Sequence, residues 1–193
     1  NGLGYQELEG NRLNDTGDGH TYMDNIYSRG VLTSGGPDPI TERYRAALIA
    51  RLGEERTNAV LGMNRFNNII YPNLIINAQY QQMRVTLPIS VDRTLVRIHC
   101  FRLKGAPDEI FHRAVRFITT LGSPASMIFS DDVEMLERCQ TGLASDTGPW
   151  IDFSRGLDDD RKDANGSISG AASEMPMRVQ FQAWLRHMTA EAA

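Results

Sequence analysis

Two adjacent acids, Asp131 and Asp132, stand at the start of a stretch with helical periodicity. On a helical wheel of about 100° per residue, the apolar residues of this stretch form one broad face: Val133, Leu136, Cys139 and Leu143. Asp132 falls in the middle of that face, whereas Asp131 points outward. A buried carboxylate is costly unless it is paired, protonated or bound to a metal. Asp132 is therefore a candidate metal ligand or catalytic acid facing a cavity.

The same two acids also suit a helix start that has no catalytic role. Acids in a first turn complement the free N–H groups and the helix dipole, and Asp131 with Glu134 fits a capping pair. This interpretation explains Asp131. For Asp132 the wheel leaves capping and metal binding equally open.

A second group of candidates consists of amides and a guanidinium on two neighbouring expected strands: Asn77, Gln79, Gln81, Gln82 and Arg84. A ligand pocket needs a few placed polar groups in an otherwise apolar wall, and such donors suit a carboxylate. The alternative for each of them is a place on an exposed polar sheet face.

The histidines and cysteines form no metal-binding pattern. The four histidines, His20, His99, His112 and His187, share no ligand-like spacing, and no Cys/His cluster could hold an iron–sulfur centre. We interpret His20 as a loop residue and His112 and His187 as solvated helix residues. Cys100 and Cys139 are expected to be reduced, buried thiols.

The elements that must position these residues follow from local patterns. Residues 1–36 predict loop with a short strand near positions 20–27. Asp38 and Pro39 predict a helix start, and Gly53 interrupts that helix. Strands are expected at 67–76, 82–89 and 94–103, and helices at 107–121, 130–144 and 179–188. Strands followed by long helices favour an α+β domain with helices on one face of an antiparallel sheet.

Composition narrows the class of protein. The chain has 193 residues, 20 Lys plus Arg, 24 Asp plus Glu and a net charge of −4, which disfavours a basic nucleic-acid binder. It contains no apolar run of about 18 residues and no signal peptide, so we expect a cytoplasmic protein without a membrane partner. It begins at Asn1 without Met, and we expect it to be the later part of a longer protein.

Several segments carry a family resemblance in their joint order: Tyr71-Pro72-Asn73-Leu74, Pro88-Ile89-Ser90-Val91-Asp92-Arg93-Thr94, Lys104-Gly105-Ala106-Pro107, Ser130-Asp131-Asp132, Glu137-Arg138-Cys139-Gln140 and Ala183-Trp184-Leu185-Arg186-His187-Met188. Over most of its length the chain resembles the catalytic domain of the large (alpha) subunit of Rieske-type aromatic-ring-hydroxylating oxygenases. It is most similar to those acting on aromatic carboxylates such as anthranilate, salicylate and benzoate.

The resemblance implies a helix-grip (START-like) fold, a curved antiparallel sheet packed around a long C-terminal helix. It also implies mononuclear Fe(II) held by two histidines and one aspartate, the second acid of a pair, which is Asp132 here. The histidine ligands and the Rieske [2Fe–2S] cluster are expected in a preceding N-terminal part. Residues 1–193 are then a single catalytic domain carrying one iron ligand of three.

The resemblance further implies the substrate and partners. Relatives build their substrate pocket on the strand pair that carries Asn77, Gln79, Gln81 and Arg84, which we expect to bind an aromatic carboxylate. Dioxygen is the second substrate, and electrons arrive from a ferredoxin or reductase through a Rieske domain. The expected assembly is a homo- or hetero-oligomer, α3 or α3β3.

Two other interpretations stay open. The absence of a histidine pair favours a metal-free helix-grip domain that only binds an apolar or aromatic small molecule. A pure assembly fragment, packed within an oligomer, would need no ligand pocket at all.

Overall fold

The computed structural model describes residues 11–24, 38–62, 65–78, 80–123, 126, 129–145, 148, 150–163 and 166–190. Its strands are β1 (Arg12–Gly17), β2 (His20–Asp24), β3 (Arg65–Ile70), β4 (Leu74–Asn77), β5 (Gln82–Ser90), β6 (Arg93–Cys100), β7 (Arg161–Asp163) and β8 (Gly166–Gly170). Its helices are α1 (Pro39–Leu52), α2 (Glu54–Leu61), α3 (Asp108–Gly122), α4 (Phe129–Ala144), α5 (Met175–Thr189) and the short 3-10 helix η2 (Leu157–Asp159).

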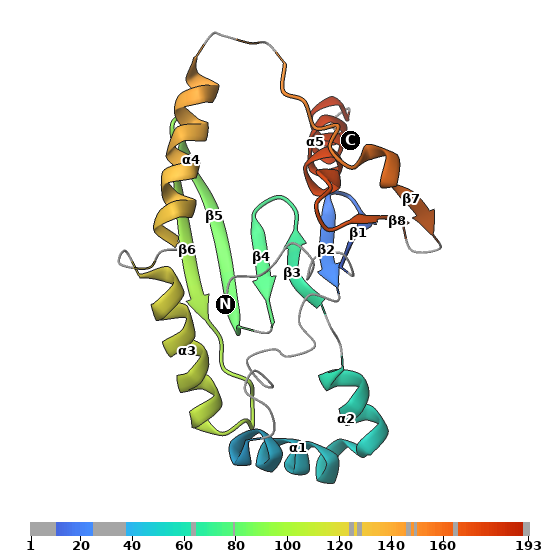
Figure 1. Cartoon of the computed structure of the whole chain (residues 1–193), viewed down its shortest axis with the longest axis vertical. Helices are drawn as coiled ribbons and strands as arrows, with labels where there is room; N and C mark the ends of the chain where they lie inside the picture. Colours follow the sequence, from blue (N-terminus) through green and yellow to red (C-terminus); the bar gives the residue numbers. More distant parts are fainter. Residues whose placement is uncertain are drawn as a thin grey trace.

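The described strands form one antiparallel sheet in the order β6-β5-β4-β3-β2-β1-β8-β7, with β6 and β7 at its edges. In Figure 1, α3 and α4 run along the β6 side of the sheet, and α5 lies beside β1 and β2. The helices α1 and α2 lie together at the bottom of the view. Cross-strand partners share a face, so the register aligns one row across the sheet: Thr21, Ile69, Ile75, Arg84 and Ile98.

The β1–β2 hairpin brings the sheet close to α5. Asp18 and Gly19 form its two-residue loop with φ of 49° and 81°, the left-handed conformations that such a turn requires. A Cβ at Gly19 would lie 2.8 Å from Cγ of Tyr71 and 2.9 Å from Cβ of Ala183. Next to it, His20 Nδ1 accepts a hydrogen bond from the backbone N–H of Tyr71 at 3.0 Å. Only glycine therefore lets this turn approach the C-terminal helix.

The inner face of α5 carries part of the core. Met175, Val179 and Ala183 recur every four residues and are buried. Met175 and Val179 pack with Leu13 of β1, and Met23 of β2 flanks them. Each such side chain contributes about 1.5–3 kcal/mol on burial, so this contact holds the helix on the β1–β2 hairpin.

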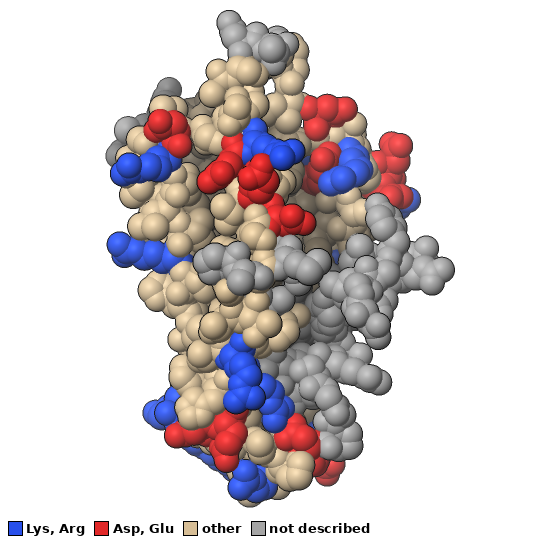
Figure 2. Space-filling model, turned by 60° about the vertical axis from the view of Figure 1, so that its left-hand side comes forward, with Lys and Arg blue, Asp and Glu red and all other residues tan. Residues whose placement is uncertain are grey.

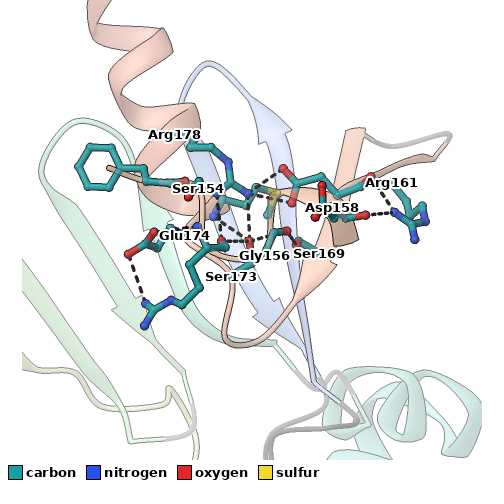
Figure 3. Close-up of polar contacts among 12 residues, drawn as sticks. Ser154, Gly156, Asp158, Arg161, Ser169, Ser173, Glu174 and Arg178 are labelled. Carbon is teal, nitrogen blue, oxygen red and sulfur yellow. Dashed lines mark hydrogen bonds and ion pairs between the residues drawn. The ribbon is translucent and has the colours of Figure 1, made fainter. Parts of the chain in front are cut away.

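Arg178 fastens the segment before β7 to the start of α5 (Figure 3). Its Nη2 donates to both carboxylate oxygens of Asp160, at 2.9 and 2.8 Å, and to Oγ of Ser173 at 3.0 Å. Its Nη1 donates to the carbonyls of Phe153 and Arg155, at 2.6 and 3.2 Å. One side chain, 14% exposed, thus satisfies acceptors from three parts of the chain.

Asp38 caps the start of α1 and also connects this helix to α3. Its carboxylate caps the helix by accepting from the backbone N–H groups of Ile40 and Thr41, at 2.9 and 3.1 Å. It also accepts two hydrogen bonds from Arg113 of α3, at 3.0 and 3.1 Å. The Arg113 guanidinium, with help from the Thr41 hydroxyl, holds the pKa of Asp38 well below its usual range. A second apolar cluster supports this joint: Tyr44, Ala106 and Ile110, flanked by Ile40, Leu48 and Leu103.

The structure confirms the α+β fold, and the helices expected at 107–121 and 130–144 lie within one residue of α3 and α4. The expected helix at 179–188 begins earlier, at Met175, where Pro176 occupies the first turn. Asp38, Pro39 and Gly53 mark the ends of α1 as predicted. None of the described helices is long and apolar enough to cross a bilayer.

Three expectations on strands and cysteines are wrong. The strand expected at 67–76 is a hairpin, β3 and β4, that turns at residues 71–73. The region before position 36 contains two strands, β1 and β2, instead of one, and β7–β8 was not expected at all. Cys100 and Cys139 are free thiols, but both are exposed instead of buried. Cys100 lies on an edge strand, and no described element covers Cys139 on α4.

Replacing Arg178 should loosen the segment before β7. Arg178→Met leaves a half-buried carboxylate and the Phe153 carbonyl without their donor, so we expect the free energy of unfolding to fall by about 2–3 kcal/mol in urea titrations. Arg161→Met is the control, because Arg161 is exposed and donates to two nearby carbonyls. Equal stabilities of the two variants would contradict this role.

Asp38 should make stability depend on pH. Its pKa is lower in the folded than in the unfolded chain, so its contribution is complete above about pH 4 and is lost as pH falls through the folded value. Asp38→Ala should therefore be less stable than wild type at pH 7, and the difference in melting temperature should shrink below pH 4. Asp159→Ala, an exposed acid, should show no such pattern. A gap that stays constant from pH 7 to pH 3 would refute the assignment.

Candidate active site

A cavity of about 230 Å³ lies between the sheet and the helices α3 and α4. The sheet contributes Asn77, Gln82, Arg84 and Ile98, and the helices contribute Phe117, Ile118, Phe129 and Asp132. A second, wide hollow runs along the outside of α4, but every residue that lines it belongs to that one helix. The first cavity is the better candidate, because walls from two layers can enclose a ligand.

Strand alternation explains which side chains reach the cavity. Gln82 and Arg84 are two residues apart on β5 and therefore share a face. Their cross-strand partners on this face are Asn77 of β4, opposite Gln82, and Ile98 of β6, opposite Arg84. Nε of Arg84 donates to Oε1 of Gln82 at 3.1 Å, which fixes the orientation of the guanidinium.

Aromatic rings form the apolar wall. Tyr80, in the β4–β5 turn, stacks on Phe117 of α3 with ring centroids 4.4 Å apart and an interplanar angle of 23°. Phe129 joins them from the first turn of α4. The sequence analysis did not single out these rings, although it expected the helix at 107–121 to lie on one face of the sheet. The wall offers flat surfaces to a planar ligand.

Asp132 borders the cavity in a manner that differs from the prediction. It lines the cavity and Asp131 does not, which agrees with the distinction drawn from the helical wheel. However, Asp132 is exposed and the apolar face around it is not buried: Val133, Leu136 and Leu143 are 39%, 57% and 65% exposed. The wheel identified a real stripe on α4, but no described element packs against it. The expectation of a buried carboxylate is therefore wrong.

Acidic side chains gather on one part of this side of the molecule, with basic side chains among and below them (Figure 2). Figure 2 brings the α3–α4 side forward and shows acids gathered over its upper part, where α4 runs in Figure 1. The helix carries four of them: Asp131, Asp132, Glu134 and Glu137. Arg138 pairs with Glu134 at 2.7 Å along the helix. Asp132 has no ion pair among the described residues, so its oxygens are available at the cavity.

The other expected substrate residues have different places. Asn77 lines the cavity, but its amide is engaged: Nδ2 donates to Asn67 at 3.1 Å, and Oδ1 accepts from the N–H of Tyr80 at 3.1 Å. Gln81 is fully buried, lies outside the cavity lining, and has no partner for its amide within the described chain. Gln79 lies outside the described residues. Gln82 was singled out with this group, and the structure makes it the partner of Arg84.

The family model for the ring hydroxylating alpha subunit (catalytic domain) matches residues 8–191. The chain belongs to this family. The ring-hydroxylating catalytic domain is 38% identical over 113 residues to the 2-halobenzoate 1,2-dioxygenase large subunit of Burkholderia cepacia, covering 58% of this chain and 24% of that protein. It is 35% identical over 140 residues to the toluate 1,2-dioxygenase subunit alpha of Pseudomonas putida, covering 67% and 30%.

Two solved structures show the same fold. The catalytic domain superposes on naphthalene 1,2-dioxygenase with indole bound at a TM-score of 0.71 and 18% identity, over 98% of this chain and 44% of that one. The Rhodococcus sp. naphthalene 1,2-dioxygenase bound to indole gives 0.67 and 20% identity, over 97% and 47%. Relative to its curated relatives the chain is short: it spans about a quarter to a third of their length. The helix-grip fold expected from the sequence is thereby confirmed.

The residues of this ring-hydroxylating domain do not make a complete iron site. Across the described ranges, no three His, Cys, Asp or Glu side chains come together to hold a metal ion. His20 binds the Tyr71 backbone, His187 stacks on the Tyr71 ring, and His99 projects from the opposite face to Arg84. Of the two histidines and one aspartate expected at an iron site, an aspartate, Asp132, is the one that lines the cavity among the described residues.

We expect Asn77 to act as a brace of the β4–β5 turn. Asn77→Ala removes the acceptor for the Tyr80 N–H and the donor to Oδ1 of Asn67, so the free energy of unfolding should fall by about 1–2 kcal/mol. Asn77→Asp keeps the acceptor for Tyr80 and should lose less. Denaturant unfolding measures both. Wild-type stability of Asn77→Ala combined with weakened ligand binding would instead make Asn77 a ligand donor.

Proposed function

We propose that the chain forms the catalytic domain of a non-haem iron oxygenase that hydroxylates or dihydroxylates an aromatic carboxylate. One observation carries the proposal: Asp132 and Arg84 border the same cavity, in a member of the ring-hydroxylating family. A carboxylate is a ligand that suits Fe(II), and a guanidinium suits an anionic substrate. The relatives named for 2-halobenzoate, toluate and anthranilate support a substrate with a carboxylate on a benzene ring.

Different residues of the cavity position different parts of the substrate. Tyr80, Phe117 and Phe129 contact the faces and edges of an aromatic ring, and Ile98 fills the sheet side. Arg84 offers the charged donor group, with Gln82 holding it in place. Fixing a ring beside the reacting atoms lowers the entropic cost of the reaction, which is the contribution these residues make.

The iron would need ligands beyond this chain. Asp132 would supply the carboxylate, and two imidazoles would come from residues outside positions 1–193, as would the Rieske [2Fe–2S] cluster that delivers electrons. In this proposal the chain is a single catalytic domain. Its substrates are the aromatic carboxylate and dioxygen.

The partners follow from the same proposal. Electrons would come from a ferredoxin or reductase, and the domain would work in a cytoplasmic α3 or α3β3 oligomer. The names of two relatives, a large subunit and a subunit alpha, support an assembly of more than one kind of subunit.

Asp132 and its neighbour provide a matched test in the intact enzyme. Asp132→Ala should lower iron content per polypeptide and reduce product formation from benzoate by at least about 100-fold. Asp131→Ala removes an equally exposed acid that does not line the cavity, and should retain both iron and activity. Metal analysis and product quantification are the measurements.

The absence of an imidazole pair around Asp132 in the described chain favours one competitor, a metal-free domain that binds an aromatic molecule. In that case the intact protein would hold no iron and form no product from benzoate, and an iron chelator would leave benzoate binding unchanged. An intact protein that binds benzoate without iron and without turnover would refute the oxygenase assignment for this cavity.

A further inference from the structure

We propose that Arg84, oriented by Gln82, is the residue that selects carboxylate-bearing rings over neutral ones. This inference deepens the proposed function and rests on it for the identity of the site. It concerns one property, substrate charge, that can be measured separately from turnover.

The guanidinium of Arg84 is only partly used by the protein. It carries five N–H donors, and one of them, on Nε, is donated to Oε1 of Gln82 at 3.1 Å. The four donors on the two terminal nitrogens have no partner in the described part of the chain. The side chain is half-buried and lines the cavity, so these donors are neither fully hydrated nor paired. A cation in this position gains from an anionic ligand.

Two other half-buried arginines show what this chain does with such a group. Arg113 holds the carboxylate of Asp38 through two hydrogen bonds, at 3.0 and 3.1 Å. Arg178 donates to both oxygens of Asp160, at 2.9 and 2.8 Å. In both cases a carboxylate of the same chain accepts the hydrogen bonds of the guanidinium. At Arg84 that place faces the cavity, and a carboxylate brought by a ligand would fill it.

Gln82 acts as a positioning residue. It is 6% exposed, so its amide is held by its surroundings. By accepting from Nε it leaves both terminal nitrogens free to bind a carboxylate through two parallel bonds. An amide does this without neutralising the cation, which a carboxylate at the same position would do.

The cavity also suits a ring at the other end of the ligand. A volume of about 230 Å³ exceeds the ~150 Å³ that accommodates benzene in an engineered protein cavity. The stacked rings of Tyr80 and Phe117 offer the apolar wall.

The test compares benzoate with benzamide, a neutral molecule of nearly the same shape, by calorimetric titration of the intact protein. Arg84→Met should weaken benzoate binding about 10- to 100-fold and change benzamide binding less than about threefold. Arg84→Lys keeps the charge but not the planar fork, and should lie between the two. Arg97→Met is the control, because this exposed arginine projects from the other face of the sheet.

Gln82→Glu tests the positioning role with almost no change in shape. It places a carboxylate against Nε of Arg84, so an internal ion pair should replace the ligand and weaken benzoate binding at least about tenfold. The same substitution in the Arg84→Met background should cost no further affinity for benzoate. A merely structural role of Gln82 would weaken both ligands in both backgrounds.

Three results would overturn the inference: wild type that does not bind benzoate, equal losses of benzoate and benzamide in Arg84→Met, or wild-type benzoate binding in Gln82→Glu. The Asp132→Ala variant keeps this separate from the oxygenase proposal. Loss of turnover in Asp132→Ala with no charge preference lost in Arg84→Met would refute the inference alone. The reverse pattern would refute the oxygenase assignment and leave Arg84 as the charge-selecting residue of a binding site.

Discussion

The antiparallel register of β4, β5 and β6 decides which side chains meet in the cavity. Because the pleat repeats every two residues, a shift of one residue would turn Gln82 and Arg84 to the opposite face and bring Met83 and Val85 into their place. The structure fixes this register at both ends of β5. At one end Asn77 holds the turn through Tyr80, and at the other Ser90 donates to Asp92 at 2.6 Å. The chemistry of the site therefore depends on two turns, one that lines the cavity through Tyr80 and one at the other end of β5 that lies outside it.

Carboxylate–arginine pairs join peripheral elements to one another. Arg113 and Asp38 connect α3 to α1, and Arg178 and Asp160 connect α5 to the segment before β7. Both pairs are half-buried, where water screens the charges less than at the surface. The same kind of group at Arg84 has no such partner among the residues described, which is why the geometry suggests a ligand there and a structural role at the other two positions.

The sequence patterns with a local physical cause predicted the structure well. Asp38 with Pro39 and Gly53 depend on capping and backbone freedom, both readable over a few residues. The β1–β2 hairpin was missed although Asp18-Gly19 is a strong hairpin signal. The strands β7 and β8 gave no apolar alternation to detect, since Ile168 is the only aliphatic side chain in their two sequences.

What local patterns could not predict is which neighbour an element finds. The apolar stripe of α4 was identified, but its exposure depends on what packs there, and the stripe itself carries no such information. Asp132 lies at the cavity, and Gln81 is buried between β4 and β5. Both positions depend on tertiary packing in the same way. In the sequence, Arg84 and Gln82 are recognisable only as neighbouring polar side chains. The hydrogen bond between them is visible only in the structure.

The order of the sheet leaves two open edges, β6 and β7, and each edge carries unpaired backbone groups that another chain could use. All three residues of β7 are charged, Arg161, Lys162 and Asp163, and β6 carries Arg93 and Arg97. Positive charge at both edges makes pairing between two copies of the same edge repulsive. The charges that border this sheet thus protect it from aggregation, and neutralising them would favour sheet-to-sheet growth between molecules over the soluble fold.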